Sequence, residues 1–340
     1  MPDLCDLTLA QLTGFVESLG LSAFRARQIF SWLYRPGIAE FGQMTDLAKE
    51  LRARLPEIAT FSRLRPAAVE ESRDGSRKYA FRLADGPVIE SVLIPEEDRL
   101  TLCISSQAGC AMGCRFCVTG SMGFRRNLRP AEIVGQVYAV NEELHGQGSR
   151  LTNLVFMGMG EPLANLENLL AALDILMDQR GLDFSSRRIT VSTCGLVPKM
   201  RELGGRAGVN LAVSLHSVRN EVRSELMPVN RTWDVEALLA ACREYPLANR
   251  RRIMFEYTLI AGLNDADADA RLLARKLAGI PCKINLLPCN EAPDLPFRRP
   301  AEERVAAFQQ ILWQAGYTVL LRTSRGDDIS AACGQLAGKL

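Results

Sequence analysis

The sequence lacks several features that would assign a chain to a common class of protein. No apolar run approaches the length needed to cross a membrane, so no membrane-spanning segment is expected. The first residues, Met1 to Asp6, carry no apolar stretch typical of a signal peptide, so we expect a cytoplasmic protein. The formal net charge is only +2 over 340 residues, which argues against non-specific coating of nucleic acid.

Histidine is scarce, and the cysteines lack the usual zinc pattern. The chain has two histidines, His145 and His216, and one compact cysteine group, Cys110, Cys114 and Cys117. Structural zinc sites usually combine two Cys-x-x-Cys pairs, and no second pair is present. A cubane iron–sulfur cluster normally has four cysteine ligands, so three would leave one iron open to a small molecule. Zinc with a distant fourth ligand is the alternative.

The other cysteines divide into two sets. Ten cysteines in a chain without an export signal are expected to be reduced. Cys333 stands between two alanines and a glycine, so its thiol has little steric cover and could meet a substrate. Cys103 precedes the cysteine group by seven residues, where it could face the open cluster position. The rest are expected to be small buried side chains: Cys5, Cys194, Cys242, Cys282 and Cys289.

The hydrophobic periodicity changes twice along the chain. Residues 8–55 repeat apolar residues at helical spacing, whereas the segments flanking Asp85-Gly86 alternate as in a β-hairpin. We therefore expect a helical N-terminal domain over 1–62, a β extension over 63–98 and a core over 99–340.

Strands and helices alternate in the core. Strands are predicted near 100–105, 152–157, 188–192, 209–214, 253–259 and 283–287. Helices are predicted over 130–144, 166–178, 234–244, 267–278 and 301–315. This succession predicts an α/β fold with a parallel sheet, either curled into a partial barrel or doubly wound.

Unusual polar residues follow these predicted strands, at the edge where ligands bind in such folds. The residues placed there are Gly160, Glu161, Ser192, Ser214, Leu215, His216 and Asn285. The turn that contains Glu161 could bring a carboxylate against a cationic ligand, such as the ammonium of an amino acid. An ordinary turn at Glu161 and a structural role for His216 are the alternatives.

Arginine clusters interrupt an otherwise balanced charge. The 41 basic residues include only six lysines. The clusters are Arg125, Arg126 and Arg129, then Arg187-Arg188, Arg250 to Arg252, and Arg298-Arg299. They suit phosphate contacts, because a guanidinium group offers paired donors. A solvated surface is the alternative.

Several motifs together resemble the RlmN/Cfr family of radical S-adenosylmethionine (SAM) RNA adenine methyltransferases. The resemblance covers nearly the whole chain. Its motifs are the Cys-x-x-x-Cys-x-x-Cys signature and its lead from Cys103, Met157 to Glu161, Ser214 to His216, Cys282 to Leu286, and the Ala-Ala-Cys-Gly-Gln-Leu segment around Cys333. It implies a partial (β/α)6 radical SAM barrel.

The resemblance also implies roles for individual residues. Cys110, Cys114 and Cys117 would hold a 4Fe-4S cluster whose open iron binds SAM. The cofactor site would be formed by Gly160, Glu161, Ser192, Ser214, Leu215, His216 and Asn285. Cys333 would carry a methyl group, Cys103 would resolve the covalent intermediate, and Glu90 would accept a proton.

The implied reaction uses two molecules of SAM, because the C2–H group of adenine is not nucleophilic. The first methylates Cys333, and the second yields a 5′-deoxyadenosyl radical that activates this methyl group for addition to the base. Attack by Cys103 then releases the product with a disulfide. The implied substrates are 23S ribosomal RNA and transfer RNA, which the N-terminal domain and the arginine clusters would contact.

Two rival functions are distinguishable. Gly160-Glu161-Pro162 and Ser324 to Asp328 resemble the adenine-C2 branch of the family rather than the C8 branch linked to antibiotic resistance. A non-catalytic iron–sulfur electron-transfer protein would need neither Cys103 nor Cys333. The favoured interpretation is a monomeric C2 methyltransferase that takes electrons from a flavodoxin-like or ferredoxin-like donor.

Overall fold

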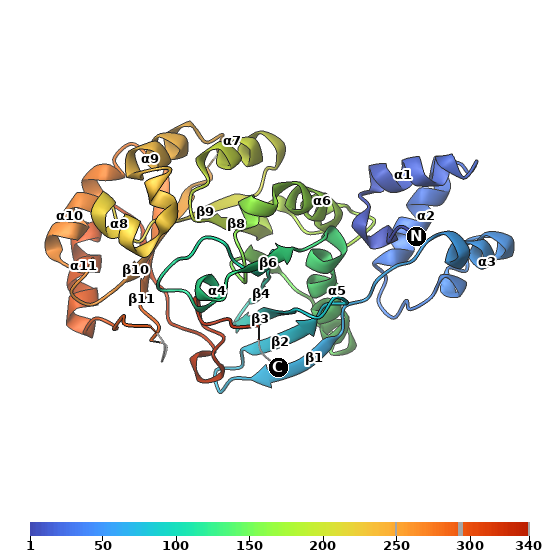
Figure 1. Ribbon diagram of the computed structural model, residues 1–340, viewed down its shortest axis with the longest axis horizontal. Helices are drawn as coiled ribbons and strands as arrows, with labels where there is room; N and C mark the ends of the chain where they lie inside the picture. The colour runs from blue at the N-terminus through green and yellow to red at the C-terminus, as the bar shows by residue number, and fades with distance from the viewer. Residues whose placement is uncertain (249, 292–294, 339–340) are drawn as a thin grey trace.

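A computed structural model describes residues 1–248, 250–291 and 295–338 of the chain. Figure 1 shows a helical N-terminal part beside a larger α/β body, with the C-terminal segment returning to the β1–β3 side of the sheet. No described helix is long and apolar enough to cross a lipid bilayer.

Three helices form most of the N-terminal part, as the helical spacing predicted: α1 (Leu9–Ser18), α2 (Ala23–Leu33) and α3 (Lys49–Ile58). Helix α1 begins with a capping box. Thr8 Oγ1 accepts a hydrogen bond from the Gln11 N–H (3.3 Å), and Gln11 Oε1 accepts one from the Thr8 N–H (2.9 Å). The helices bury apolar residues that belong to one hydrophobic core together with the α/β body: Leu12, Val16, Ile29, Phe30, Leu33, Leu51 and Leu55.

The predicted hairpin is confirmed by β2 (Arg77–Arg82) and β3 (Val88–Glu96), which pair antiparallel around the turn at Asp85-Gly86. Strand β1 (Pro66–Glu71) pairs with β2 on the outer side. Strand β3 also pairs with the first core strand, so this extension and the core share one sheet.

The sheet has ten strands in the order β1-β2-β3-β4-β7-β8-β9-β10-β11-β12. All six predicted core strands are confirmed, and they run parallel: β4 (Arg99–Cys103), β7 (Asn153–Phe156), β8 (Ile189–Thr193), β9 (Asn210–Ser214), β10 (Ile253–Leu259) and β11 (Cys282–Pro288). The prediction missed β12 (Val319–Leu321), which is too short to show alternation.

Helices follow most of these strands. The predicted ones are confirmed as α5 (Pro130–Gly146), α6 (Leu166–Met177), α9 (Val235–Glu244), α10 (Asp267–Lys276) and α11 (Glu302–Gln314). Three more, α4 (Val118–Ser121), α7 (Val197–Arg206) and α8 (Asn220–Leu226), escaped prediction. Helix α7 contains one proline and two glycines, which lower helix propensity, and α8 spans only two turns.

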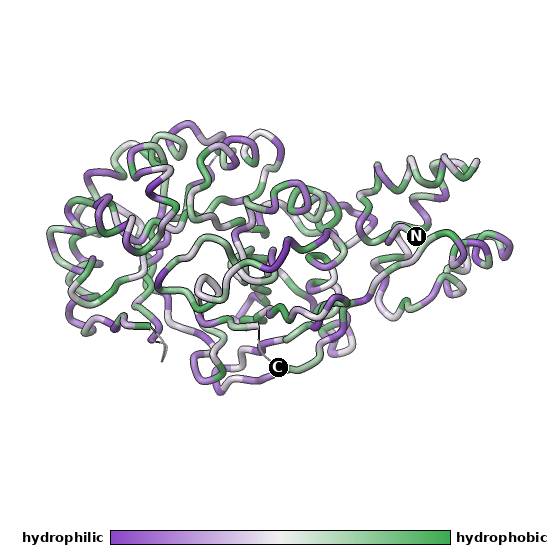
Figure 2. Tube along the Cα trace, viewed as in Figure 1, coloured by the Kyte–Doolittle hydropathy of each residue, from purple (hydrophilic) through white to green (hydrophobic). Residues whose placement is uncertain are grey.

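The sheet stays open in the part of the chain that the structure describes, because β1 and β12 are its two edges. The fold is therefore a partial barrel, with helices α6, α7, α9, α10 and α11 on its outer face (Figure 1). Figure 2 shows hydrophobic and hydrophilic residues alternating along these helices, as one-sided burial requires. Helix α6 buries Leu166, Leu169, Leu170, Leu173 and Leu176 at helical spacing.

Candidate active site

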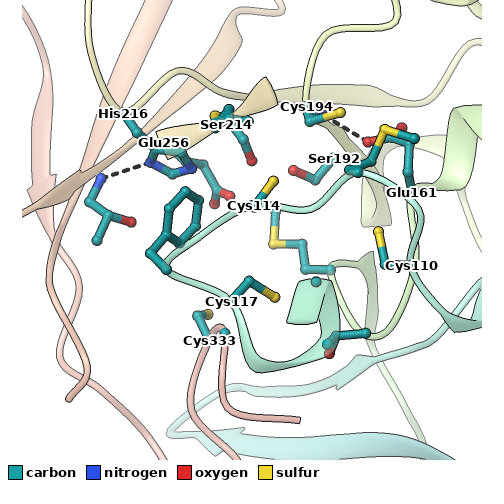
Figure 3. Close-up of a pocket in the computed structure, with 18 of the residues that line it drawn as sticks. Cys110, Cys114, Cys117, Glu161, Ser192, Cys194, Ser214, His216, Glu256 and Cys333 are labelled. Carbon is teal, nitrogen blue, oxygen red and sulfur yellow. Dashed lines mark hydrogen bonds between the residues drawn. The ribbon is translucent and has the colours of Figure 1, made fainter. Parts of the chain in front are cut away.

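The three clustered cysteines lie on a loop between β5 (Gln107–Gly109) and α4 (Val118–Ser121). Strand β5 pairs antiparallel with β6 (Phe124–Asn127), so the two strands that flank the loop are joined at its base. The Cys110 N–H donates to Gly123 O (3.0 Å). Figure 3 shows the cysteines of the loop around the inner space of the cavity.

This loop covers a cavity, here called the main cavity, at the carboxyl ends of the parallel strands (Figure 3). Most of the predicted site residues line it: Cys110, Cys114, Cys117, Gly160, Glu161, Ser192, Ser214, His216 and Cys333. These side chains come from segments more than 200 residues apart in sequence. The structure therefore brings together the residues that the strand-end rule had assigned to one edge.

Glu161 is held by two backbone groups. Its Oε1 accepts from the Leu163 N–H (2.9 Å) and its Oε2 from the Cys194 N–H (2.8 Å; Figure 3). Burial is the largest influence on this carboxyl group and raises its pKa. A cation in the main cavity would restore the charged form, which agrees with the expected ammonium contact.

His216 has a left-handed backbone, with φ 56°, at the end of β9. Its Nδ1 accepts a hydrogen bond from the Thr258 N–H (2.9 Å; Figure 3). Its ring packs edge-on against the ring of Phe116, with the two ring centroids 4.6 Å apart. Burial lowers the pKa of His216 to about 3, so the ring is neutral near pH 7. The remaining proton is therefore on Nε2, which can donate to a ligand.

A buried arginine that sequence reasoning missed supports this edge. Arg223, only 1% exposed, donates to the carbonyl oxygens of Cys194 (2.7 Å) and Leu215 (3.1 Å) and to Asn230 Oδ1 (2.9 Å). Burial lowers its pKa to about 10. The side chain of the predicted site residue Leu215 is buried away from the main cavity, and its carbonyl is part of this support.

Glu256 also escaped prediction. It lines the main cavity from the centre of β10, and burial raises its pKa. The predicted residue Asn285 lies opposite it on β11, buried behind the cavity lining, where its Nδ2 contacts Met254 Sδ at 2.8 Å. A glutamate inside a buried strand is costly without a function, and that signal was readable in the sequence.

Two of the cysteines assigned to simple burial also line the main cavity, Cys194 and Cys289. Both are buried, as expected. The remaining three, Cys5, Cys242 and Cys282, are buried away from it. Burial raises the pKa of Cys5 and of Cys242 to about 12, which keeps these thiols protonated.

The C-terminal segment carries Cys333 to the cysteine loop. The Val118 N–H donates to Gly334 O (2.7 Å), and Thr119 Oγ1 donates to Leu336 O (2.6 Å). A Cβ on Gly334, whose φ is 84°, would lie 3.2 Å from Phe116 O. Glycine therefore permits the close approach that places Cys333 beside Cys117 (Figure 3).

Cys333 borders two cavities. The second cavity lies next to the main one and is lined by Cys103, Cys333 and Arg322, among others. The Cys333 residue keeps exposed surface, while burial of its thiol raises the pKa. Burial also raises the pKa of Cys103. The two predicted catalytic thiols thus share one space.

Glu90 lies outside the lining of both cavities. Its carboxyl group is buried, with Oε2 accepting from the Ala337 N–H (2.9 Å) and Oε1 3.9 Å from Lys78 Nζ. The side chain therefore anchors the C-terminal segment just beyond Cys333. Its role as a proton acceptor stays a prediction.

The donor set of the cysteine loop fits an iron–sulfur cluster. Among the described residues, no group of His, Cys, Asp or Glu is arranged to hold a single metal ion. In a cubane cluster each thiolate binds a different iron, so its ligands are spread apart rather than converging on one point. Thiolates are the soft ligands that such clusters favour, and the three thiols form no disulfide and remain available.

Two of the arginines that follow the cysteine loop, Arg126 and Arg129, are paired with acids. Arg126 binds Asp85 and Glu132 through its guanidinium group, and Arg129 pairs with Asp6. Asp85 and Asp6 come from distant elements, which is why sequence proximity did not reveal them, whereas Glu132 lies close to both arginines in the sequence. The expected RNA contacts of these two arginines would have to compete with internal ion pairs.

The partial barrel and the three-cysteine loop define a radical SAM enzyme, and comparisons narrow this class. Residues 2–61 match the model of the "Ribosomal RNA large subunit methyltransferase N-terminal domain", and residues 104–273 match the "Radical SAM superfamily". "Dual-specificity RNA methyltransferase RlmN" of Desulfotalea psychrophila is 57% identical, covering 98% of this chain and 94% of the relative. The chain belongs to the RlmN family.

Two further comparisons cover the whole chain. The RlmN protein of Geobacter sulfurreducens is 54% identical, over 100% of this chain and 93% of its own length. A crystal structure of a radical SAM methyltransferase from Sphaerobacter thermophilus is 47% identical, with a TM-score of 0.94 and full coverage of both chains. The family implies a 4Fe-4S cluster and SAM as cofactors, in agreement with the donor set.

Proposed function

We propose that this protein methylates the C2 carbon of adenosines in 23S ribosomal RNA and transfer RNA, with two molecules of SAM per turnover. The observation that carries the proposal is the position of Cys333, which borders both the main cavity and the second cavity that contains Cys103. A protein that only transferred electrons would gain nothing from this pair of thiols.

Three cysteines would hold the cluster, namely Cys110, Cys114 and Cys117, all of which line the main cavity. When bound, the cluster supplies the electron that converts SAM to a 5′-deoxyadenosyl radical. Glu161 would accept from the ammonium group of SAM, and the neutral His216 would donate from Nε2. These contacts would orient the cofactor before cleavage.

Cys333 would first become methylated. Its thiolate attacks the sulfonium methyl group of SAM, so a bond from Sγ to carbon forms while the bond from the methyl group to the sulfonium breaks. S-adenosylhomocysteine leaves. Because burial raises the pKa of this thiol, the attack requires loss of its proton within the cavity. Loss of one hydrogen atom from the methyl group then allows addition to C2 of the base.

Cys103 would release the product. The radical adduct would first give up one electron, for which the cluster would be the acceptor, and then its C2 proton. Cys103 Sγ attacks Cys333 Sγ, and a disulfide forms as the sulfur–carbon bond breaks. The carbon leaves with the electron pair and takes a proton, which completes the methyl group. A dithiol reductant must then restore both cysteines.

Glu90 would accept the C2 proton, and its observed contact permits a decisive substitution. Glu90→Gln keeps an oxygen that can accept from the Ala337 N–H but cannot take a proton. We expect RNA methylation to slow by roughly 10²-fold or more, the usual size of a lost acid–base contribution. Methylation of Cys333 should continue, as intact-protein mass spectrometry would report.

Glu90→Ala is the matched control, because it removes the anchor of the C-terminal segment as well. It should impair methylation of Cys333 in addition to methylation of RNA. A wild-type rate of RNA methylation in Glu90→Gln would show that another group takes the proton.

The electron source, oligomeric state and location complete the proposal. The reaction needs a low-potential donor, for which a flavodoxin-like or ferredoxin-like protein is suited. A monomer suffices, because one chain supplies all the proposed residues. A reducing cytoplasm would keep the thiols active.

Nucleoside analysis tests the proposed function directly. The reconstituted protein would be incubated with SAM, a reductant and unmodified RNA, followed by digestion and separation of 2-methyladenosine from 8-methyladenosine. Formation of 2-methyladenosine is expected. A product methylated at C8 would assign the chain to the rival branch, and SAM cleavage without RNA methylation would favour an electron-transfer role.

A further inference from the structure

A second opening lies at the amino ends of the parallel strands. Residues two apart on a strand face the same side, so Thr190, Met254 and Lys283 share a face with Ser192, Glu256 and Asn285, respectively. The first three line a groove of 760 Å³. The concave side of the sheet is therefore open at both ends, with the main cavity at one end and this basic groove at the other.

The basic groove collects charges that are far apart in sequence. Its lining contains four arginines and one lysine: Arg187, Arg250, Arg251, Arg252 and Lys283. No aspartate or glutamate of the described chain lines it, and none of its basic side chains forms an ion pair with a described carboxylate. This distinguishes the groove from Arg126, whose guanidinium is neutralised by two carboxylates.

Two of these cations are held in place by hydrogen bonds to the protein. Arg251 donates to Gly208 O and to Ser186 Oγ (3.0 Å), and Arg252 donates to Thr318 Oγ1 (3.0 Å). Neutral acceptors position these guanidinium groups without cancelling their charge. Arg250 has a left-handed backbone, with φ 64°, an uncommon conformation for a residue other than glycine.

The pKa of Lys283 reflects the concentration of positive charge in the groove. Its side chain is half-buried, and desolvation lowers its pKa, followed by repulsion from Arg322, Arg99 and Arg252. Like charges brought together without a counter-charge destabilise a fold, and a bound polyanion would offset this cost.

We infer that the basic groove binds backbone phosphates of the substrate RNA, at a distance from the adenosine that reacts in the main cavity. This inference rests on the proposed function for the identity of the polyanion. Arg252 in the groove and Thr258 in the main cavity lie at the two ends of β10. At roughly 3.3 Å per residue they are about 20 Å apart, so RNA that reaches both openings must extend several nucleotides beyond the target base. Guanidinium forks match phosphate oxygens in pairs.

Charge reversal at two exposed arginines tests the inference. Arg187 and Arg250 have no side-chain hydrogen bond to another described residue, so Arg187→Glu/Arg250→Glu should fold normally. Arg271→Glu/Arg275→Glu, on the exposed face of α10, makes the same change in net charge away from the groove. Binding of an unmodified transfer RNA transcript to the reconstituted full-length protein would be measured against salt concentration.

The groove variant should bind RNA at least tenfold more weakly than the wild type at about 0.1 M salt. The slope of the logarithm of its binding constant against the logarithm of the salt concentration should be shallower by about 1.5, because each of the two lost phosphate contacts contributes roughly 0.7 to 0.9. The α10 variant should bind like the wild type. SAM cleavage without RNA should be equal in all three proteins, which shows that the cofactor site is intact.

Three outcomes would overturn the inference. One is unchanged affinity and salt dependence in the groove variant. Another is a groove variant that binds RNA normally but loses turnover when a protein, rather than a chemical reductant, supplies the electrons. That result would indicate that the groove binds an acidic protein. The third is a groove variant that binds RNA normally but no longer binds tripolyphosphate, which would indicate a site for a small polyphosphate rather than for RNA. If RNA binds through the groove but 2-methyladenosine never forms, the proposed function fails and the groove remains an RNA site.

Discussion

Replacing Cys103 with alanine is expected to stop the reaction after the RNA has become covalently attached to Cys333. Only a second thiol held in the same cavity can attack Cys333 Sγ efficiently and break the sulfur–carbon bond. A thiol from solution would have to replace one that is already positioned, so turnover should fall by roughly 10³-fold or more. The trapped species should contain one RNA per protein chain.

Denaturing electrophoresis would detect this adduct, and nuclease digestion with mass spectrometry would locate it on Cys333. Cys103→Ala/Cys333→Ala should form no adduct, because the attachment point is missing. Cys242→Ala is the matched control, since Cys242 is buried and lines neither cavity. Normal turnover by Cys103→Ala would refute the assignment of the resolving thiol.

The sequence alone predicted the six core strands and the edge at which the site lies, because both depend on local patterns. Buried strands appear as short apolar runs, and the polar residues that interrupt or end them, such as Ser192 and Ser214, must have a reason to be there. Parallel topology then places these strand ends at one edge. The short strand β12 and the glycine-containing helix α7 lack such patterns.

Pairings between distant residues were not predictable in the same way. The ion pair between Arg126 and Asp85 depends on where Asp85 lies after folding, and the support given by Arg223 depends on carbonyl groups that carry no sequence signal. The basic groove is the converse case. Its two arginine clusters were visible in the sequence, but only the fold shows that they meet around Lys283, with no acid among the described residues that line the groove.

Replacing Gly160 with alanine should disturb the cofactor site, because the added methyl group has no room. Gly160 has φ +98°, and an added Cβ would lie 2.5 Å from Gln107 Cβ and 2.8 Å from Gln107 N. Relief would require movement of Gln107, whose Oε1 accepts from the Glu161 N–H (2.9 Å). The carboxylate expected to bind the SAM ammonium would move with it.

The expected loss in the free energy of unfolding for Gly160→Ala is about 2–5 kcal/mol, from backbone strain combined with overpacking. Gly262→Ala separates these effects, because Gly262 has φ +71° but no atom within 4 Å of the added Cβ, so only the strain of about 1–2 kcal/mol applies. Urea midpoints would report stability, and titration with SAM would report affinity. The opposite outcome is a Gly160→Ala variant that matches Gly262→Ala in stability and binds SAM normally. That result would show that the close packing of this turn against Gln107 does not orient Glu161.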